Sequence, residues 1–129
     1  MLNNKGQSLV LFVVVLPILM LILILVIDIG NIVLLKQELK TISNIVLDYG
    51  LENIEKDNID NELETLVKLN KNDIDSVNIY IKDNKIYVDL KERTDGLFTS
   101  FINISIFDVN TSYVGYIDNG EKRIEKMGD

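Results

Sequence analysis

The sequence of 129 residues contains no cysteine and no histidine. The lack of cysteine excludes disulfides, a CxxC redox site and lipid attachment to a thiol. The lack of histidine removes the usual participant from zinc sites, Ser-His-Asp triads and imidazole acid–base catalysis. The remaining residues show no recognisable pairing of a nucleophile with a base. We therefore predict a protein that is not an enzyme and that uses no metal and no cofactor.

Basic residues are few, with 13 lysines and arginines against 20 aspartates and glutamates, which gives a net charge of −7. Every acidic residue lies from Asp28 onward, and Lys5 is the only basic residue before it. Because phosphate contacts need clustered Lys and Arg, such a surface binds nucleic acid poorly. The acidic part would also be repelled by anionic lipid. We predict no nucleic-acid partner.

The acidic residues of one stretch invite a calcium interpretation; they are Glu52, Glu55, Asp57, Asp60, Glu62 and Glu64. A calcium loop places its ligands at alternate positions around a glycine turn, as in D-x-D-x-D-G. This stretch lacks that spacing, so a solvated acidic face is the favoured interpretation.

The N-terminal part of the chain carries a long uncharged run. No residue from Gly6 to Ile27 is charged, and Leu9 to Ile27 holds only Leu, Ile, Val and Phe besides Pro17 and one Met. A helix of about 20 residues crosses the roughly 30 Å hydrocarbon layer. The 17 Leu, Ile, Val and Phe residues favour insertion by about 5–10 kcal/mol as an upper bound. We predict a transmembrane helix over 8–27, after a short cytoplasmic N-terminus over 1–7.

This helix is predicted to stay in the mature protein as a single-pass anchor. The apolar run exceeds the roughly 7–15 residues of a signal-peptide core, and no A-x-A-like cleavage site follows it. Pro17 removes one helix hydrogen bond and is expected to kink the helix, which membrane helices tolerate. Lys5 and the terminal amine favour a cytoplasmic N-terminus, with the C-terminal domain outside the cytoplasm at the cell surface.

A second helical pattern continues directly from the anchor, over residues 28–50. Its apolar residues recur at steps of three and four, and they are Ile32, Leu35, Leu39, Ile42, Val46 and Tyr49. Gly50 is predicted to terminate this amphipathic extension. The apolar stripe needs a partner, which is either the chain's own domain or a neighbouring subunit.

Residues 51–129 predict a small extracytoplasmic α+β domain. A short helix is expected from about 58 to 69, capped by Asp57 or Asn58. Its apolar face would consist of Ile59, Leu63, Leu66 and Val67.

A β-hairpin follows, because two runs alternate apolar with polar residues. The apolar positions are Val77, Ile79, Ile81, Ile86, Val88 and Leu90. A two-residue turn at Asp83-Asn84 pairs Ile81 with Ile86 and puts both apolar rows on one face. Tyr80 then meets Tyr87 on the other face.

The rest of the domain predicts an apolar linker over 97–102, a third strand from about 107 to 117, a turn at Asn119-Gly120 and a short final strand. The predicted fold is therefore of the α+β class, with a long N-terminal helix packed on a small antiparallel sheet.

The string KGQSLVLFVVVLP at residues 5–17 and the Asp and Gly after the apolar run resemble the TadE/TadG-like family. The positions that match in order are Lys5, Gly6, Val10, Phe12, Leu16, Pro17, Asp28 and Gly30. The resemblance covers about the first thirty residues. It implies a pilin-like protein, or pseudopilin, of the tight-adherence (Flp) pilus system.

The resemblance also implies a processing site. Prepilin peptidase cuts pilin-like subunits after a glycine, and many of them carry Glu at the fifth residue after the cut. A cut between Gly6 and Gln7 would make Leu11 that fifth residue. The usual Glu offsets the new amine of a neighbouring subunit in an apolar core, where an unpaired charge is costly. With Leu11, this chain either occupies a tip or initiating position or never leaves the membrane.

Three functional hypotheses follow. The favoured one is a minor subunit or assembly factor of a Tad-type pilus or related secretion system, with the lipid bilayer and other pilin-like or assembly proteins as partners. The second is a signal-anchored binding or sensor domain unrelated to pili. The third, a membrane-tethered enzyme, lacks visible catalytic residues.

Individual anchor residues have alternative interpretations. Lys5 is either a processing and topology signal or a charge that only stops the helix from sliding. Asp28 and Gly30 could engage a partner helix, but the favoured interpretation is that Asp28 marks the membrane interface.

Overall fold

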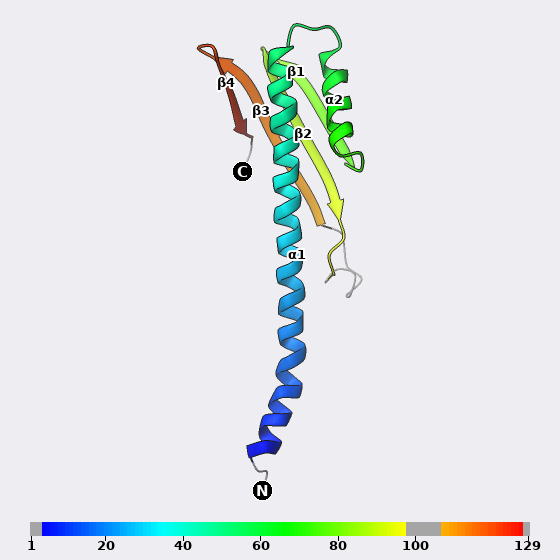
Figure 1. Cartoon of the computed structure of the whole chain (residues 1–129), viewed down its shortest axis with the longest axis vertical. Coiled ribbons are helices and arrows are strands. Elements are labelled where there is room, and N and C mark those ends of the chain that lie inside the picture. Colours follow the sequence, from blue (N-terminus) through cyan, green and yellow to red (C-terminus); the bar gives the residue numbers. More distant parts are fainter. Residues whose placement is uncertain (1–3, 98–106, 128–129) are drawn as a thin grey trace.

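The computed structural model describes residues 4–97 and 107–127. Its helices are α1 (Asn4–Glu52) and α2 (Ile59–Asn70), and its strands are β1 (Ser76–Lys82), β2 (Lys85–Thr94), β3 (Phe107–Asp118) and β4 (Glu121–Lys126). The strands form one antiparallel sheet in the order β1-β2-β3-β4. Figure 1 shows both helices on one face of this sheet, with the N-terminal half of α1 extending alone beyond the domain. The predicted α+β, pilin-like architecture is confirmed.

Helix α1 runs without a break through the predicted anchor and the predicted amphipathic extension. Pro17 lies inside it and does not end it. In a membrane-type helix the hydrogen bond lost at a proline is one of many, so the helix continues on both sides. The helical pattern predicted over residues 8–50 is therefore one continuous helix, and the structure extends it to Asn4 and Glu52.

The apolar stripe on the second half of α1 packs against the chain's own sheet. Leu39, Ile42 and Val46 are buried, and they meet Ile86, Val88, Leu90, Val109 and Tyr113 from the strands and Leu63 and Val67 from α2. Ile32, Leu35 and Tyr49 are partly buried against the same core. The sequence leaves open whether this stripe packs against the chain's own domain or against a neighbouring subunit. The structure shows that it packs against the chain's own domain.

The prediction that Gly50 terminates α1 is wrong, because the helix continues to Glu52. Gly50 is needed for close packing instead. A Cβ atom at this position would lie 2.8 Å from Cδ1 of Ile86 and 3.0 Å from Cδ1 of Leu63. These distances are shorter than ordinary van der Waals contact, so only glycine lets α1 approach both α2 and β2 here.

Helix α2 begins one residue later than predicted, at Ile59, and buries the expected apolar face. The predicted side-chain cap is absent: Asn58 occupies the N-cap position but makes no capping hydrogen bond. Its backbone is left-handed, at φ 62° and ψ 26°, a conformation that asparagine adopts more readily than most residues. Asn58 thus turns the chain into α2 through its backbone.

The β1–β2 hairpin has the predicted register. Ile81 pairs with Ile86, and Tyr80 pairs with Tyr87. The turn residues Asp83 and Asn84 have φ values of 53° and 61°, as a type I′ turn requires. The two tyrosine rings stack 4.7 Å apart on the sheet face opposite the helices.

The third strand and the tail strand are confirmed as β3 and β4, joined by a turn at Asn119 and Gly120, where φ is 52° and 81°. Lys122 of β4 bridges back to the end of α1, with Nζ 2.9 Å from Oδ1 of Asp48 and 2.6 Å from Oε1 of Glu52. Of the predicted apolar linker over 97–102, residues 98–102 lie outside the described residues.

Candidate functional site

The most distinctive surface of the protein is the uncovered half of α1. Its large apolar side chains are exposed at nearly every position from Leu9 to Ile29, and none of the most apolar 18-residue window is buried inside the chain. In the described part of the chain, α1 is the one helix long and apolar enough to cross a membrane. Water is a poor solvent for so large an apolar surface, so it requires lipid or other helices around it. The helix is compatible with a membrane anchor.

The candidate processing residues lie on the first turns of α1. Lys5, Gln7, Leu11 and Phe12 are exposed, and Gly6 is half-buried. The Leu11 side chain, at the position of the usual pilin Glu, is 64% exposed. These residues lie far from the sheet domain, because Leu11 and Asp28 are roughly 25 Å apart along the helix axis. The residues that carry the family resemblance therefore fall into two separate groups, one at the start of α1 and one around Asp28, and do not form one site.

Asp28 belongs to the second group, and the structure buries it. Its relative exposure is 2%, although it directly follows the predicted membrane span. The backbone N–H of Leu97, which follows β2, donates a hydrogen bond of 2.7 Å to Oδ1 of Asp28. Gly96 packs so closely that a Cβ atom there would lie 2.5 Å from Oδ2 of Asp28 and 2.6 Å from Cε2 of Phe107. Asp28 thus holds the base of the sheet domain against α1.

Gly30 takes no part in this contact, since nothing lies within 4 Å of a Cβ placed there. It is exposed on α1, on a part of the helix that the sheet domain leaves open. A larger side chain would meet no obstacle within the chain.

A cluster of charges joins α1, α2 and β2 at the end of α2. Nζ of Lys71 lies 3.3 Å from Oε1 of Glu92, 3.3 Å from Oδ1 of Asp73 and 3.6 Å from Oε1 of Glu38. Glu92 is only 7% exposed, and its Oε2 is buried without a hydrogen-bond partner. Sequence reasoning missed this cluster, because Glu92 occupies an inward position of a strand that otherwise alternates regularly.

The electrostatics of this cluster follow from burial and from the neighbouring charges. Burial raises the pKa of Glu92 above its usual 4.5, and the nearby Lys71 ammonium only partly offsets this. Burial acts to lower the pKa of Lys71, but Glu92, Asp73 and Glu38 together outweigh it and raise that pKa above 10.5. Lys71 is therefore a charged residue that compensates a carboxylate with little access to water.

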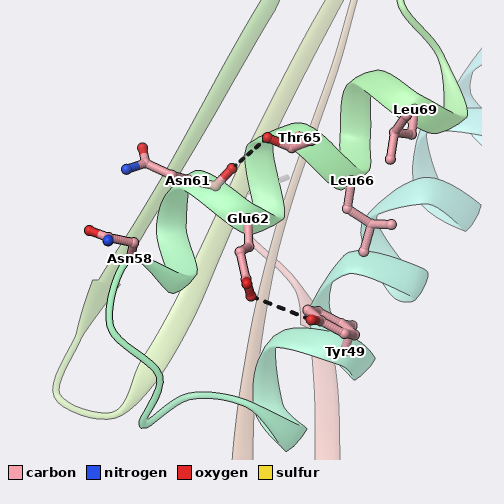
Figure 2. Close-up of a pocket in the computed structure, with 7 residues that line it drawn as sticks. All are labelled: Tyr49, Asn58, Asn61, Glu62, Thr65, Leu66 and Leu69. Carbon is pink, nitrogen blue, oxygen red and sulfur yellow. Dashed lines mark hydrogen bonds between the residues drawn. The ribbon is translucent and has the colours of Figure 1, made fainter.

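An open groove of about 600 Å³ lies between the end of α1 and α2 (Figure 2). It is lined by Tyr49, Asn58, Asn61, Glu62, Thr65, Leu66 and Leu69. The Tyr49 hydroxyl donates to Oε2 of Glu62 at 3.4 Å, and the Thr65 hydroxyl donates to the Asn61 carbonyl oxygen at 2.9 Å. Glu62 supplies the one carboxylate of the lining. Among residues 4–97 and 107–127, no three acidic side chains are grouped so as to hold a metal ion.

Comparison with known proteins places the N-terminal segment beside a described family. Residues 6–43 match the sequence pattern of a family described as TadE-like protein. This segment contains the exposed anchor, Asp28 and the first buried residues of the apolar stripe. No curated protein and no solved structure matches the chain.

Proposed function

We propose, from the match of residues 6–43 to the TadE-like family, that the chain is a member of that family and a membrane-anchored, pilin-like minor subunit or assembly factor. The family points to proteins related to the Tad pilus. The protein would serve a Tad-type pilus or a related secretion system, and it would act through contacts with other proteins rather than through catalysis. The N-terminus would be cytoplasmic and the sheet domain extracytoplasmic.

The observation that carries this proposal is the division of α1 into two halves. One half is buried against the sheet, so the domain cannot turn freely about the helix. The other half is apolar on all sides and uncovered. Membrane helices of this kind associate laterally by van der Waals packing. A partner that binds the anchor within the membrane would therefore also fix the orientation of the domain outside it.

Association within the membrane can be tested by photo-crosslinking in the native cell. With a photoreactive residue at Leu23, which is exposed on the anchor, we expect covalent adducts with membrane-anchored pilus or secretion components, identified by mass spectrometry. The matched control carries the same residue at Leu47, which is fully buried against the sheet, and should give only products within the chain. If Leu23 yields no protein adducts, the chain is a solitary anchored domain and the assembly role fails.

Processing is a separate proposal. We propose a prepilin-peptidase cut between Gly6 and Gln7, at the exposed end of α1. The intact mass of the purified protein should fall by the mass of residues 1–6 in cells with the peptidase and stay at full length in cells without it. Gly6→Leu should block the cut in cells that contain the enzyme. A full-length mass in both strains would exclude processing while leaving the anchor unaffected.

A further inference from the structure

The contact between Asp28 and Leu97 fixes the height at which the sheet domain meets the anchor. Leu97 is bonded through its backbone to the first residue after the predicted span over 8–27. Its side chain is 54% exposed and is not taken up by the domain core. An apolar side chain is thus held beside α1 at the level where the helix leaves the hydrocarbon layer.

The surface of α1 around this level is itself apolar. Ile29, Val33 and Leu34 are exposed, and Lys36 is the first basic residue beyond them. Asn31 is the one exposed polar side chain between Asp28 and Lys36, so charged residues return to the helix only about two turns above Asp28. Leu97 therefore adds an exposed apolar side chain on the Asp28 side of α1, at a level where the open side of the helix also exposes apolar residues.

From this geometry we propose that the base of the sheet domain rests on the membrane, with Leu97 entering the lipid interface and Asp28 as the residue that positions it. The proposal rests on the membrane anchor of the proposed function. The partner of this second contact is the lipid surface itself. The chain would then touch the bilayer at two points, the α1 helix and Leu97.

The burial of Asp28 supports this interpretation. A carboxylate beside the hydrocarbon layer is costly unless hydrogen bonds and neighbouring groups replace its hydration. The Leu97 N–H supplies such a hydrogen bond from the domain, and Gly96 packs against the carboxylate. The domain therefore covers Asp28 on the side of α1 that faces the sheet. The net negative charge of the domain opposes binding to anionic lipid, so an uncharged headgroup is the matching surface.

The absence of tryptophan from the sequence makes a direct depth measurement feasible. Full-length protein with Leu97→Trp would be reconstituted in phosphatidylcholine vesicles that carry a quencher either near the headgroup or at the end of the acyl chain. We expect blue-shifted emission that the headgroup-level quencher reduces more strongly. Two matched variants calibrate depth: Leu19→Trp in the middle of the anchor, and Ile117→Trp, which is exposed at the distal end of β3.

The outcomes separate the two proposals. If Leu19→Trp is quenched from the acyl chain but Leu97→Trp behaves like Ile117→Trp, the anchor stands and the second lipid contact is refuted. If Leu19→Trp is also unquenched, the anchor itself is refuted.

The positioning role of Asp28 is tested in the Leu97→Trp background. Adding Asp28→Ala should increase quenching by aqueous iodide, because the segment loses its acceptor. Adding Asp28→Asn, which keeps an acceptor oxygen, should restore most of the protection. Equal protection in all three proteins would show that Asp28 does not position Leu97.

Discussion

Replacing Leu19 and Ile22 with arginine is expected to remove the full-length protein from the carbonate-washed membrane pellet. Each substitution removes a favourable apolar residue and adds a charge that costs about 2.5–3.5 kcal/mol at the centre of a membrane helix. Together they cost about 6–8 kcal/mol, which equals most of the upper bound of about 5–10 kcal/mol for the whole anchor. Both side chains are exposed on α1, so neither substitution disturbs the sheet domain. The measurement is the fraction of protein in the pellet.

A matched control adds the same two charges elsewhere. Asn61→Arg and Thr65→Arg place two arginines on the exposed face of α2 and should leave the protein in the pellet. The anchor would be disproved if the Leu19 and Ile22 variant stayed in the pellet as completely as this control. Release of the unmodified protein by carbonate would disprove it equally.

The elements of the fold that rest on local patterns were predictable. The hairpin register follows from a two-residue turn and two alternating rows, and each of these independently pairs Ile81 with Ile86. The long helix follows from an apolar run that passes into a three- and four-residue stripe without any breaker other than Pro17. In these segments the local conformational preference and the burial pattern favour the same structure. A short stretch of sequence is therefore enough to predict each of them.

The features that escaped prediction depend on residues far apart in the chain. Asp28 and Leu97 are separated by 69 positions, and neither belongs to a motif that indicates the other. Gly50 has the appearance of a helix terminator, and only the approach of Ile86 and Leu63 shows why glycine is required there. Lys71, at the end of α2, pairs with both Glu92 of β2 and Glu38 of α1. A single sequence carries no signal for such tertiary contacts.

These long-range contacts share one consequence for the proposed role. Asp28 with Leu97, Glu38 with Lys71, and Asp48 with Lys122 join α1 to the domain near its base, its middle and its end. With the packed apolar stripe between them, they make the upper half of α1 and the sheet one unit. A partner that binds the anchor thus orients the whole domain.

Replacing Lys71 with methionine is expected to lower the free energy of unfolding of the domain by roughly 3–5 kcal/mol, because it leaves the buried Glu92 carboxylate without its counter-charge. Domains are typically stable by only about 5–15 kcal/mol, so this is a large loss. Urea unfolding of the full-length protein in detergent micelles would measure it. All five tyrosines lie in the domain half and the chain has no tryptophan, so tyrosine fluorescence reports on the domain.

The pH dependence gives this prediction a second readout. The pKa of Glu92 is raised in the folded protein, so its cost is present at neutral pH and disappears as the pH falls through that pKa. The pKa of Lys71 is also raised, so its stabilising contribution is present below pH 10.5 and is lost as the pH rises through the folded value. The difference between wild type and Lys71→Met should therefore be largest near neutral pH and shrink in both directions.

Two further variants separate the buried charge from other effects of the substitution. Lys68→Met removes a nearby lysine, in the last turn of α2, whose ion pair with Glu64 is exposed, and it should cost less than about 1 kcal/mol. The double variant Lys71→Met with Glu92→Met should recover most of the loss, because an apolar pair replaces a buried charge pair. If the double variant were as unstable as Lys71→Met alone, lost packing around Lys71 rather than the uncompensated Glu92 would account for the effect. If Lys68→Met and Lys71→Met lowered the free energy of unfolding equally, the burial of Glu92 would contribute nothing to the effect of Lys71→Met.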